Sequence, residues 1–156
     1  MRIRKEITEK DISHISEILR STGFFYDFEI ETAIEIAEET LSKGEQSGYS
    51  FLFLEDEHTY AFASFGEIPC TKNRFDLYWI GVHEDKRGEG LGSLLLKETE
   101  KAVKTLGGKI LYIETSSREK YVPTREFYIK NGYKIETVLE DFYDDGDGKV
   151  IYSKRM

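Results

Sequence analysis

The feature that most constrains the fold is a glycine-rich segment that lies between a strand pattern and a helix pattern. Residues 75–82 are rich in aromatic and β-branched side chains, which is typical of a strand. After the glycines, apolar residues recur with helical spacing, namely Leu91, Leu94, Leu95, Ala102, Val103 and Leu106. Gly88, Gly90 and Gly92 are therefore predicted to lie where a strand leads into a helix.

A junction of this kind is suited to binding a pyrophosphate group. The first N–H groups of a helix have no partner within the helix, and the helix dipole adds partial positive charge at that end. Glycine lacks the Cβ atom that would hold a phosphate away, and it permits the positive φ angles of an anion-binding loop. We therefore expect residues 88–92 to receive the diphosphate of a ligand.

Glycine-rich loops occur in several folds, and the spacing of the glycines separates them. A P-loop requires Lys and then Ser or Thr after its last glycine, but here Gly92 is followed by Ser93 and Leu94, which excludes it. A dinucleotide fingerprint requires glycine intervals of one and then two residues, and the second interval here is only one. Because Glu114 ends the next predicted strand, an NAD-binding domain remains a weak alternative.

Residues 87–92 read Arg-Gly-Glu-Gly-Leu-Gly, which resembles the acetyl-CoA signature of the GNAT N-acetyltransferase superfamily. That signature is Arg or Gln, two residues, Gly, one residue, and Gly or Ala. The resemblance extends over almost all of the chain. In a second segment, residues 121–133, the matches to the family are Tyr128, Gly132 and Tyr133, whereas Tyr121 and Thr124 replace the usual Asn and Ala.

The resemblance implies an α/β (α+β) fold with a mixed, mostly antiparallel central sheet. This sheet would have about six to seven strands and would be flanked by about four helices. The two central strands, residues 75–82 and 109–115, are expected to splay apart at their C-terminal ends. With 156 residues, the chain fits a single acetyltransferase domain over residues 1–156.

The resemblance also implies that acetyl-CoA is the co-substrate and that its pantetheine arm enters the gap between the splayed strands. There it would hydrogen-bond the backbone around Ile80 and Val82. The cofactor-binding residues that follow from this are Ile80, Gly81, Val82, Arg87, Gly88, Glu89, Gly90, Leu91, Gly92, Ser93, Thr115, Tyr121, Arg125 and Tyr128.

The reaction that the family performs is direct transfer of an acetyl group to a primary amine of a small molecule or peptide. An alkyl amine has a pKa of about 10.4, so a base is needed to free its lone pair at neutral pH. Asp76 and Glu67 are the candidate bases, with Asp76 preferred. By strand alternation, Asp76 should share a face with Ile80 and Val82. The phenol of Tyr128 is expected to protonate the departing thiolate.

Between the two helices predicted before residue 44 lies an aromatic segment that ends in an acid, residues 24–27. These residues can be core anchors and a helix cap. In the family, however, this segment lines the acceptor pocket, so the resemblance implies that Phe25, Tyr26 and Asp27 bind substrate together with Asp76. Aromatic and acidic side chains of this kind suit a cation.

Composition sets the remaining expectations. The net charge of −8 opposes binding to nucleic acid or to anionic membranes, and no apolar run approaches the length of a membrane span. One cysteine, Cys70, allows no internal disulfide, and together with the lack of a signal-peptide pattern it favours the cytoplasm. No metal site is expected, and a homodimer is an open option. The alternative function is an acetyl-CoA-binding sensor without turnover.

Overall fold

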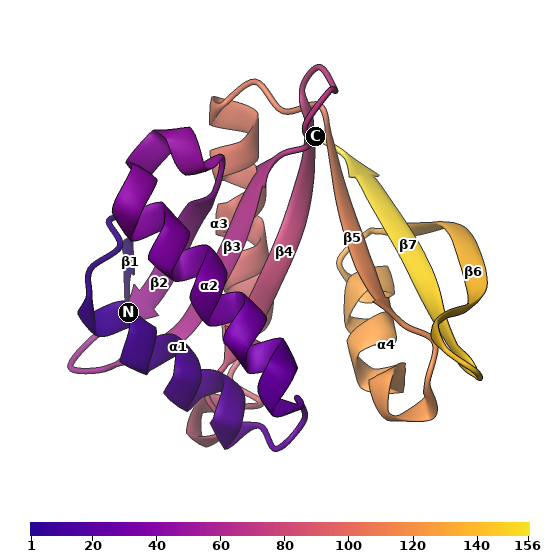
Figure 1. The fold of residues 1–156 in the computed structure, drawn as a ribbon, viewed down its shortest axis with the longest axis horizontal. Helices are drawn as coiled ribbons and strands as arrows, with labels where there is room; N and C mark the ends of the chain where they lie inside the picture. Colours follow the sequence, from indigo (N-terminus) through magenta and orange to yellow (C-terminus); the bar gives the residue numbers. More distant parts are fainter.

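The computed structural model describes all 156 residues, and a seven-stranded sheet runs through its centre (Figure 1). In the spatial order β1-β2-β3-β4-β5-β7-β6, the strands are β1 (Arg2–Arg4), β2 (Ser50–Glu55), β3 (Thr59–Glu67), β4 (Arg74–Val82), β5 (Ile110–Ser116), β7 (Asp147–Arg155) and β6 (Lys134–Asp144). The four α-helices are α1 (Lys10–Ser21), α2 (Asp27–Lys43), α3 (Leu91–Thr105) and α4 (Val122–Lys130). Only β4 and β5 are parallel neighbours, so the predicted mixed, mostly antiparallel sheet is confirmed.

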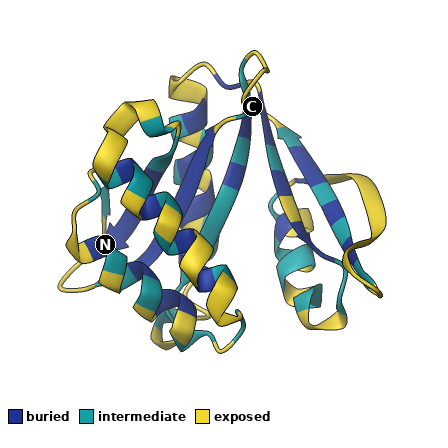
Figure 2. Cartoon of the chain, viewed as in Figure 1, coloured by how far each residue is buried: buried dark blue, intermediate teal, exposed yellow.

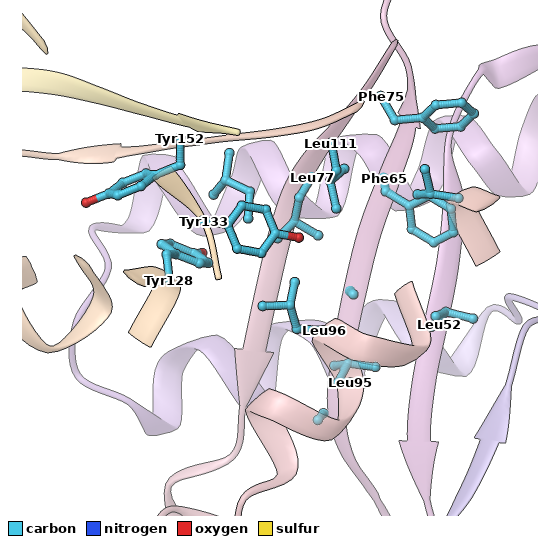
Figure 3. Packing of buried hydrophobic residues seen from close by; sticks show 14 of the residues in the cluster. Leu52, Phe65, Phe75, Leu77, Leu95, Leu96, Leu111, Tyr128, Tyr133 and Tyr152 are labelled. Carbon is cyan, nitrogen blue, oxygen red and sulfur yellow. The ribbon is translucent and has the colours of Figure 1, made fainter. Parts of the chain in front are cut away.

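The half of the sheet formed by β1 to β4 is covered on both faces. Helices α1 and α2 lie on one face and α3 lies on the other (Figure 1). The apolar spacing along each helix produces two separate cores, one under α1 and α2 and one under α3. Phe53 belongs to the first core, Leu95 belongs to the second, and both are fully buried. Figure 3 shows the second core, which continues into a group of tyrosines on α4 and β7.

The two central strands separate after a short paired stretch, as the family resemblance implies. They are paired only from Arg74 with Ile110 to Leu77 with Ile113, and beyond these residues they diverge (Figure 1). The N–H of His83 donates to the carbonyl of Tyr60 on the β3 side at 2.7 Å. Because bonding direction alternates along an antiparallel pair, the backbone groups of residues 80 and 82 point away from β3 and into the gap.

A β-bulge changes the predicted facing of β4. In the pairing with β3, Ser64 lies opposite Trp79 and Phe65 lies opposite Leu77, so Tyr78 is an extra residue. Ile80 and Val82 consequently pack with Phe75 and Leu77 in the core under α3, whereas Trp79 packs under α1 and α2. The prediction that Asp76 shares a face with Ile80 and Val82 is wrong, because one extra residue reverses the alternation. Asp76 faces the α1 and α2 side.

The half of the sheet formed by β5, β7 and β6 is covered differently. Helix α4 lies over one face, and no helix covers the other (Figure 1). Every residue of β6, residues 134–144, is exposed (Figure 2). This strand bulges away from β7 around Asp141, whose φ is 56°. A tight turn joins β6 to β7, where Asp144 pairs with Asp147. No helix in the molecule is both long enough and apolar enough to cross a membrane.

Candidate active site

The gap between β4 and β5 opens into a cleft of about 1040 Å³, the size of a site for an extended ligand. Its walls come from both halves of the sheet: from β4 and the α1–α2 connection on one side, and from β5, α4 and the β6–β7 hairpin on the other. The glycine loop lies at its edge through Arg87, Gly88 and Gly92. No group of three or more His, Cys, Asp or Glu side chains is placed to hold a metal ion.

The glycine loop lies at the start of a helix, where the sequence places it. Gly88 and Gly90 have φ angles of 78° and 76°, and Gly90 is the N-cap residue of α3. The backbone N–H groups of residues 88–93 have no acceptor within the chain, and Leu94 is the first to donate, to the carbonyl of Gly90 at 3.1 Å. This loop therefore presents a row of free donors at the positive end of a helix dipole.

Gly92 has a different role from the other two glycines. Its φ is not positive, because it already belongs to α3. A Cβ atom at this position would lie 3.3 Å from the ring of Phe127 on α4. Glycine at residue 92 therefore lets the start of α3 approach α4 closely beside the cleft.

Most of the predicted cofactor residues line the cleft. Those that do are Ile80, Gly81, Val82, Arg87, Gly88, Gly92, Thr115, Tyr121 and Tyr128. Glu89 and Gly90 are exposed on the loop outside the lining, and Leu91 is turned into the core. The hydroxyl of Ser93 accepts a hydrogen bond from Asn131 Nδ2 at 3.3 Å. The side chains of the loop residues therefore lie in different surroundings, and the group that each of residues 88–93 can offer to a ligand is its backbone N–H.

Arg125 lies on α4 but is not part of the cleft lining. Its Nη1 donates to the carbonyl oxygens of Ser116 at 2.8 Å and Arg118 at 2.7 Å. The guanidinium thus fixes the end of β5 and the turn that follows it. Of its nitrogens, only Nη1 is hydrogen-bonded, to these two carbonyls, and the contact of Arg125 with the cofactor stays a prediction.

Tyr128 is the buried residue of α4, and it lines the cleft. Its ring lies 5.6 Å from the ring of Tyr152 and 6.1 Å from that of Tyr133, centroid to centroid (Figure 3). Burial, and to a lesser extent Tyr152, raises the pKa of the Tyr128 phenol above its usual value. The phenol therefore keeps its proton throughout the neutral range and can act as a donor.

Asp76 lies near the closed end of the gap, where β4 still pairs with Tyr112 on β5. Burial first, and then the charge of Glu114, raise the pKa of Asp76 to about 6, while Lys149 acts in the opposite direction. Glu114 lines the cleft itself, and its carboxylate lies 2.9 Å from Lys149 Nζ. Asp76 lies opposite Tyr112, which is two residues before Glu114 on β5, so Asp76 is the nearer of the two carboxylates to the closed end of the gap.

Three predicted catalytic or substrate residues, Glu67, Asp27 and Asp76, are not part of the cleft lining. Glu67 is exposed at the end of β3, next to the turn at the closed end of the gap. Asp27 is the first residue of α2; its side chain is 81% exposed and forms an ion pair with Arg20 at 2.9 Å. Both Glu67 and Asp27 are close in sequence to segments that line the cleft, but the sequence does not show which way their side chains point. The structure supports neither the assignment of Glu67 as a base nor that of Asp27 as a substrate residue.

Phe25 and Tyr26 do line the cleft, together with residues that the sequence analysis did not assign. Among the latter are Glu29, Glu114, Lys120, Tyr143 and Asp147. Glu114 was visible as an acid at the end of a strand. Tyr143 and Asp147 reach the cleft because β7 lies beside β5, and local pattern gives no signal for that neighbourhood.

A model of the acetyltransferase (GNAT) domain family matches residues 46–135, which include the glycine loop and Tyr128. The chain belongs to the GNAT acetyltransferase family. Among its relatives, an N-alpha-acetyltransferase of Sulfurisphaera tokodaii is 30% identical over 79% of this chain and 69% of its own length. An uncharacterised N-acetyltransferase of Methanocaldococcus jannaschii is 30% identical over 49% of this chain, and the match spans about half (48%) of that relative.

Crystal structures of two other proteins have the same architecture. A protein of Desulfovibrio desulfuricans assigned to the GNAT acetyltransferases is 39% identical, with a TM-score of 0.96 over 99% of this chain and 98% of that one. An aminoglycoside 6'-N-acetyltransferase crystallised with coenzyme A is 21% identical, with a TM-score of 0.77 over 99% and 97% of the two chains. At that identity the likeness is one of fold.

Proposed function

We propose that this GNAT protein transfers an acetyl group directly from acetyl-CoA to a primary amine of a small molecule or peptide. The observation that carries the proposal is the row of free N–H groups of residues 88–93, which lies beside the gap between β4 and β5. The fold that it shares with a structure containing coenzyme A supports the same ligand here. In this proposal the diphosphate binds the loop and the pantetheine arm follows β4 into the gap.

The backbone groups of Ile80 and Val82 face the gap and have no partner on β5. They are suited to hydrogen-bond the amides of an extended arm, as an additional strand would. The N–H of Val82 is the donor that we assign to the thioester oxygen. A fixed N–H at this position stabilises the negative charge that develops on the oxygen when the amine attacks.

Proton transfer requires an acceptor for the amine proton and a donor for the thiolate. We assign the carboxylate pair of Asp76 and Glu114 as the acceptor, since the raised pKa of Asp76, about 6, is close to neutral pH. The amine nitrogen forms a bond to the acetyl carbon, and the carbon–sulfur bond breaks. The leaving sulfur takes the phenolic proton of Tyr128; solvent then returns a proton to the phenolate and takes the amine proton from the carboxylate pair. Holding the amine and the thioester together contributes up to roughly 7–11 kcal/mol in favourable cases.

The decisive experiment combines calorimetry and turnover on the purified protein. Coenzyme A should bind to it, and acetyl-CoA should be consumed when a panel of primary amines is added, with the amine-free reaction as the control. Absence of coenzyme A binding would overturn the proposal. Binding without consumption of acetyl-CoA by any amine would instead favour the sensor without turnover.

A further inference from the structure

The ammonium group of Lys120 lies inside a cage of three aromatic rings at the edge of the cleft. Its Nζ is 5.0 Å from the ring centroids of Phe24 and Tyr26 and 5.3 Å from that of Tyr121. The same nitrogen donates to the carbonyl of Phe24 at 3.1 Å. All four residues line the cleft. An alkylammonium ion is therefore already accommodated here, and the protein itself supplies it.

The rings are held by one another as well as by Lys120. Those of Phe24 and Tyr121 pack edge to face with centroids 4.6 Å apart, and Tyr26 stacks on Phe28 at 5.5 Å. Phe24 and Tyr26 belong to the α1–α2 connection, whereas Tyr121 ends the short 3-10 helix before α4. The cage thus joins the two walls of the cleft. The contacts of Phe24 with Tyr121 and of Tyr26 with Phe28 do not involve Lys120, so they can persist when Lys120 leaves.

The surroundings favour a cation at this position. Burial, and then the carboxylates of Glu29 and Asp147, raise the pKa of Tyr121 to about 12, and both carboxylates belong to residues that line the same cleft. Arg118, a second cation of the cleft, is paired, with its Nε 3.3 Å from the Asp147 carboxylate. Lys120 forms no ion pair and is exposed, so its ammonium group can leave the cage and be hydrated by solvent.

The cage is separate from the reacting centre. Tyr121 is the N-cap residue of α4, and Tyr128 follows seven residues later on the same helix. At 1.5 Å per residue this is roughly 10 Å along the axis. A group bound in the cage is therefore not the amine that meets Tyr128, but another part of the same acceptor.

We propose that the cage of Phe24, Tyr26 and Tyr121 binds a second alkylammonium group of the acceptor, and that Lys120 occupies this subsite until an alkyl diamine displaces it. The inference rests on the proposed function, because it takes the cleft as the acceptor site. Lys120 is an internal competitor: the apparent affinity for a diamine is reduced by the fraction of molecules in which Lys120 fills the cage.

The test is calorimetric titration of 1,8-diaminooctane into the protein saturated with coenzyme A, compared with n-octylamine, which has the same carbon chain but a single amine. Eight carbons allow the two nitrogens of the diamine to span the distance between the cage and Tyr128. The Lys120→Met variant should bind the diamine roughly three- to ten-fold more tightly than the wild type, with a smaller change for n-octylamine. Tyr121→Leu should weaken diamine binding by a similar factor. Lys104→Met, which removes an exposed charge at the end of α3, is the charge-matched control and should change neither affinity.

Diamine affinity that is equal in the wild type and Lys120→Met, or an equal rise in the affinity for n-octylamine, would overturn the subsite. So would a loss of diamine binding in Lys120→Met while its thermal unfolding stays unchanged. Because these readouts need no turnover, a protein that binds the diamine as expected but never consumes acetyl-CoA supports the subsite and refutes the proposed transfer reaction. Turnover of other amines with no diamine binding does the reverse.

Discussion

The two halves of the sheet differ in how helices cover them. Strands β1 to β4 are enclosed between α1 and α2 on one face and α3 on the other, whereas β5, β7 and β6 have α4 on one face alone (Figure 2). The enclosed half fixes the position of β4 and of the glycine loop. The open half leaves Glu114 and the β6–β7 hairpin accessible beside the cleft. The candidate site lies along the line where the two halves separate.

Charged side chains show the same contrast. In the enclosed half, the carboxylate of Asp11 is completely buried and lies 2.8 Å from the guanidinium of Arg4, which is 16% exposed. In the open half, Glu114 pairs with Lys149 but remains 44% exposed. The first pair joins β1 to α1, and its carboxylate is buried and already hydrogen-bonded within the chain, so it is not available to a ligand. The second leaves a carboxylate facing the cleft, where it can meet a cation.

The largest expected effect tests whether the enclosed half carries most of the stability. Leu54 on β2 is completely buried, and Leu139 on β6 is 41% exposed. Leu54→Ala should lower the free energy of unfolding by about 2–5 kcal/mol, because it leaves a cavity in the core. Leu139→Ala should cost less than about 1 kcal/mol. Chemical denaturation measures both, and equal losses would show that β6 is covered in solution.

The second prediction concerns the tyrosines that join α4 to β7. Tyr128→Phe should lower kcat by about 10²-fold, equivalent to about 3 kcal/mol in the barrier, since it removes the proposed proton donor. Coenzyme A affinity should be retained. Tyr152→Phe is the matched control: its hydroxyl is buried without a hydrogen-bond partner, and it lies outside the cleft lining. A kcat for Tyr128→Phe within two-fold of that of Tyr152→Phe would remove Tyr128 from the donor role.

Local pattern was enough to predict two helices before residue 44, the helix after the glycines and the position of the glycine loop at the start of α3. It failed where a long-range pairing decides the outcome. The bulge at Tyr78 exists because β4 is registered against β3, and this pairing alone moves Asp76 to the other face. Likewise, Asp147 reaches the cleft only through the neighbourhood of β5 and β7, about thirty residues apart in sequence. The side chain of Arg125 could not be placed before the turn that it holds was known.

The third prediction concerns the effect of Asp76, which lies where the two halves of the sheet meet, on stability. Since burial and Glu114 raise the pKa of Asp76 from 3.8 to about 6, the folded state holds this proton more tightly than the unfolded state does. Ionisation of Asp76 therefore removes stability as the pH rises from about 4 to about 6. Asp76→Asn should be more stable than the wild type at pH 8, on the order of 1–3 kcal/mol, with a smaller difference at pH 4.

The same variant should lose activity while it gains stability. A base must be ionised, so kcat/KM of the wild type should fall below an apparent pKa of about 6. Asp76→Asn should lower kcat/KM about ten-fold at pH 8 and remove this acidic limb; we expect no larger loss because Glu114 shares the role. An unchanged pH profile in Asp76→Asn would assign the limb to another group and make Asp76 a structural carboxylate.

The smallest expected effect separates the glycine loop from an ordinary turn in the open half. Gly90, before α3, and Gly146, in the β6–β7 hairpin, have the same φ of 76°, and a Cβ atom would meet nothing within 4 Å at either position. Alanine should therefore cost about 1 kcal/mol of stability at both, from backbone strain alone. Only Gly90→Ala should also weaken coenzyme A binding, because the strain is relieved by turning the loop N–H groups away from the ligand. If both variants bind coenzyme A as the wild type does, residues 88–93 are a structural turn like residues 144–147, and the two halves differ in cover but not in ligand binding.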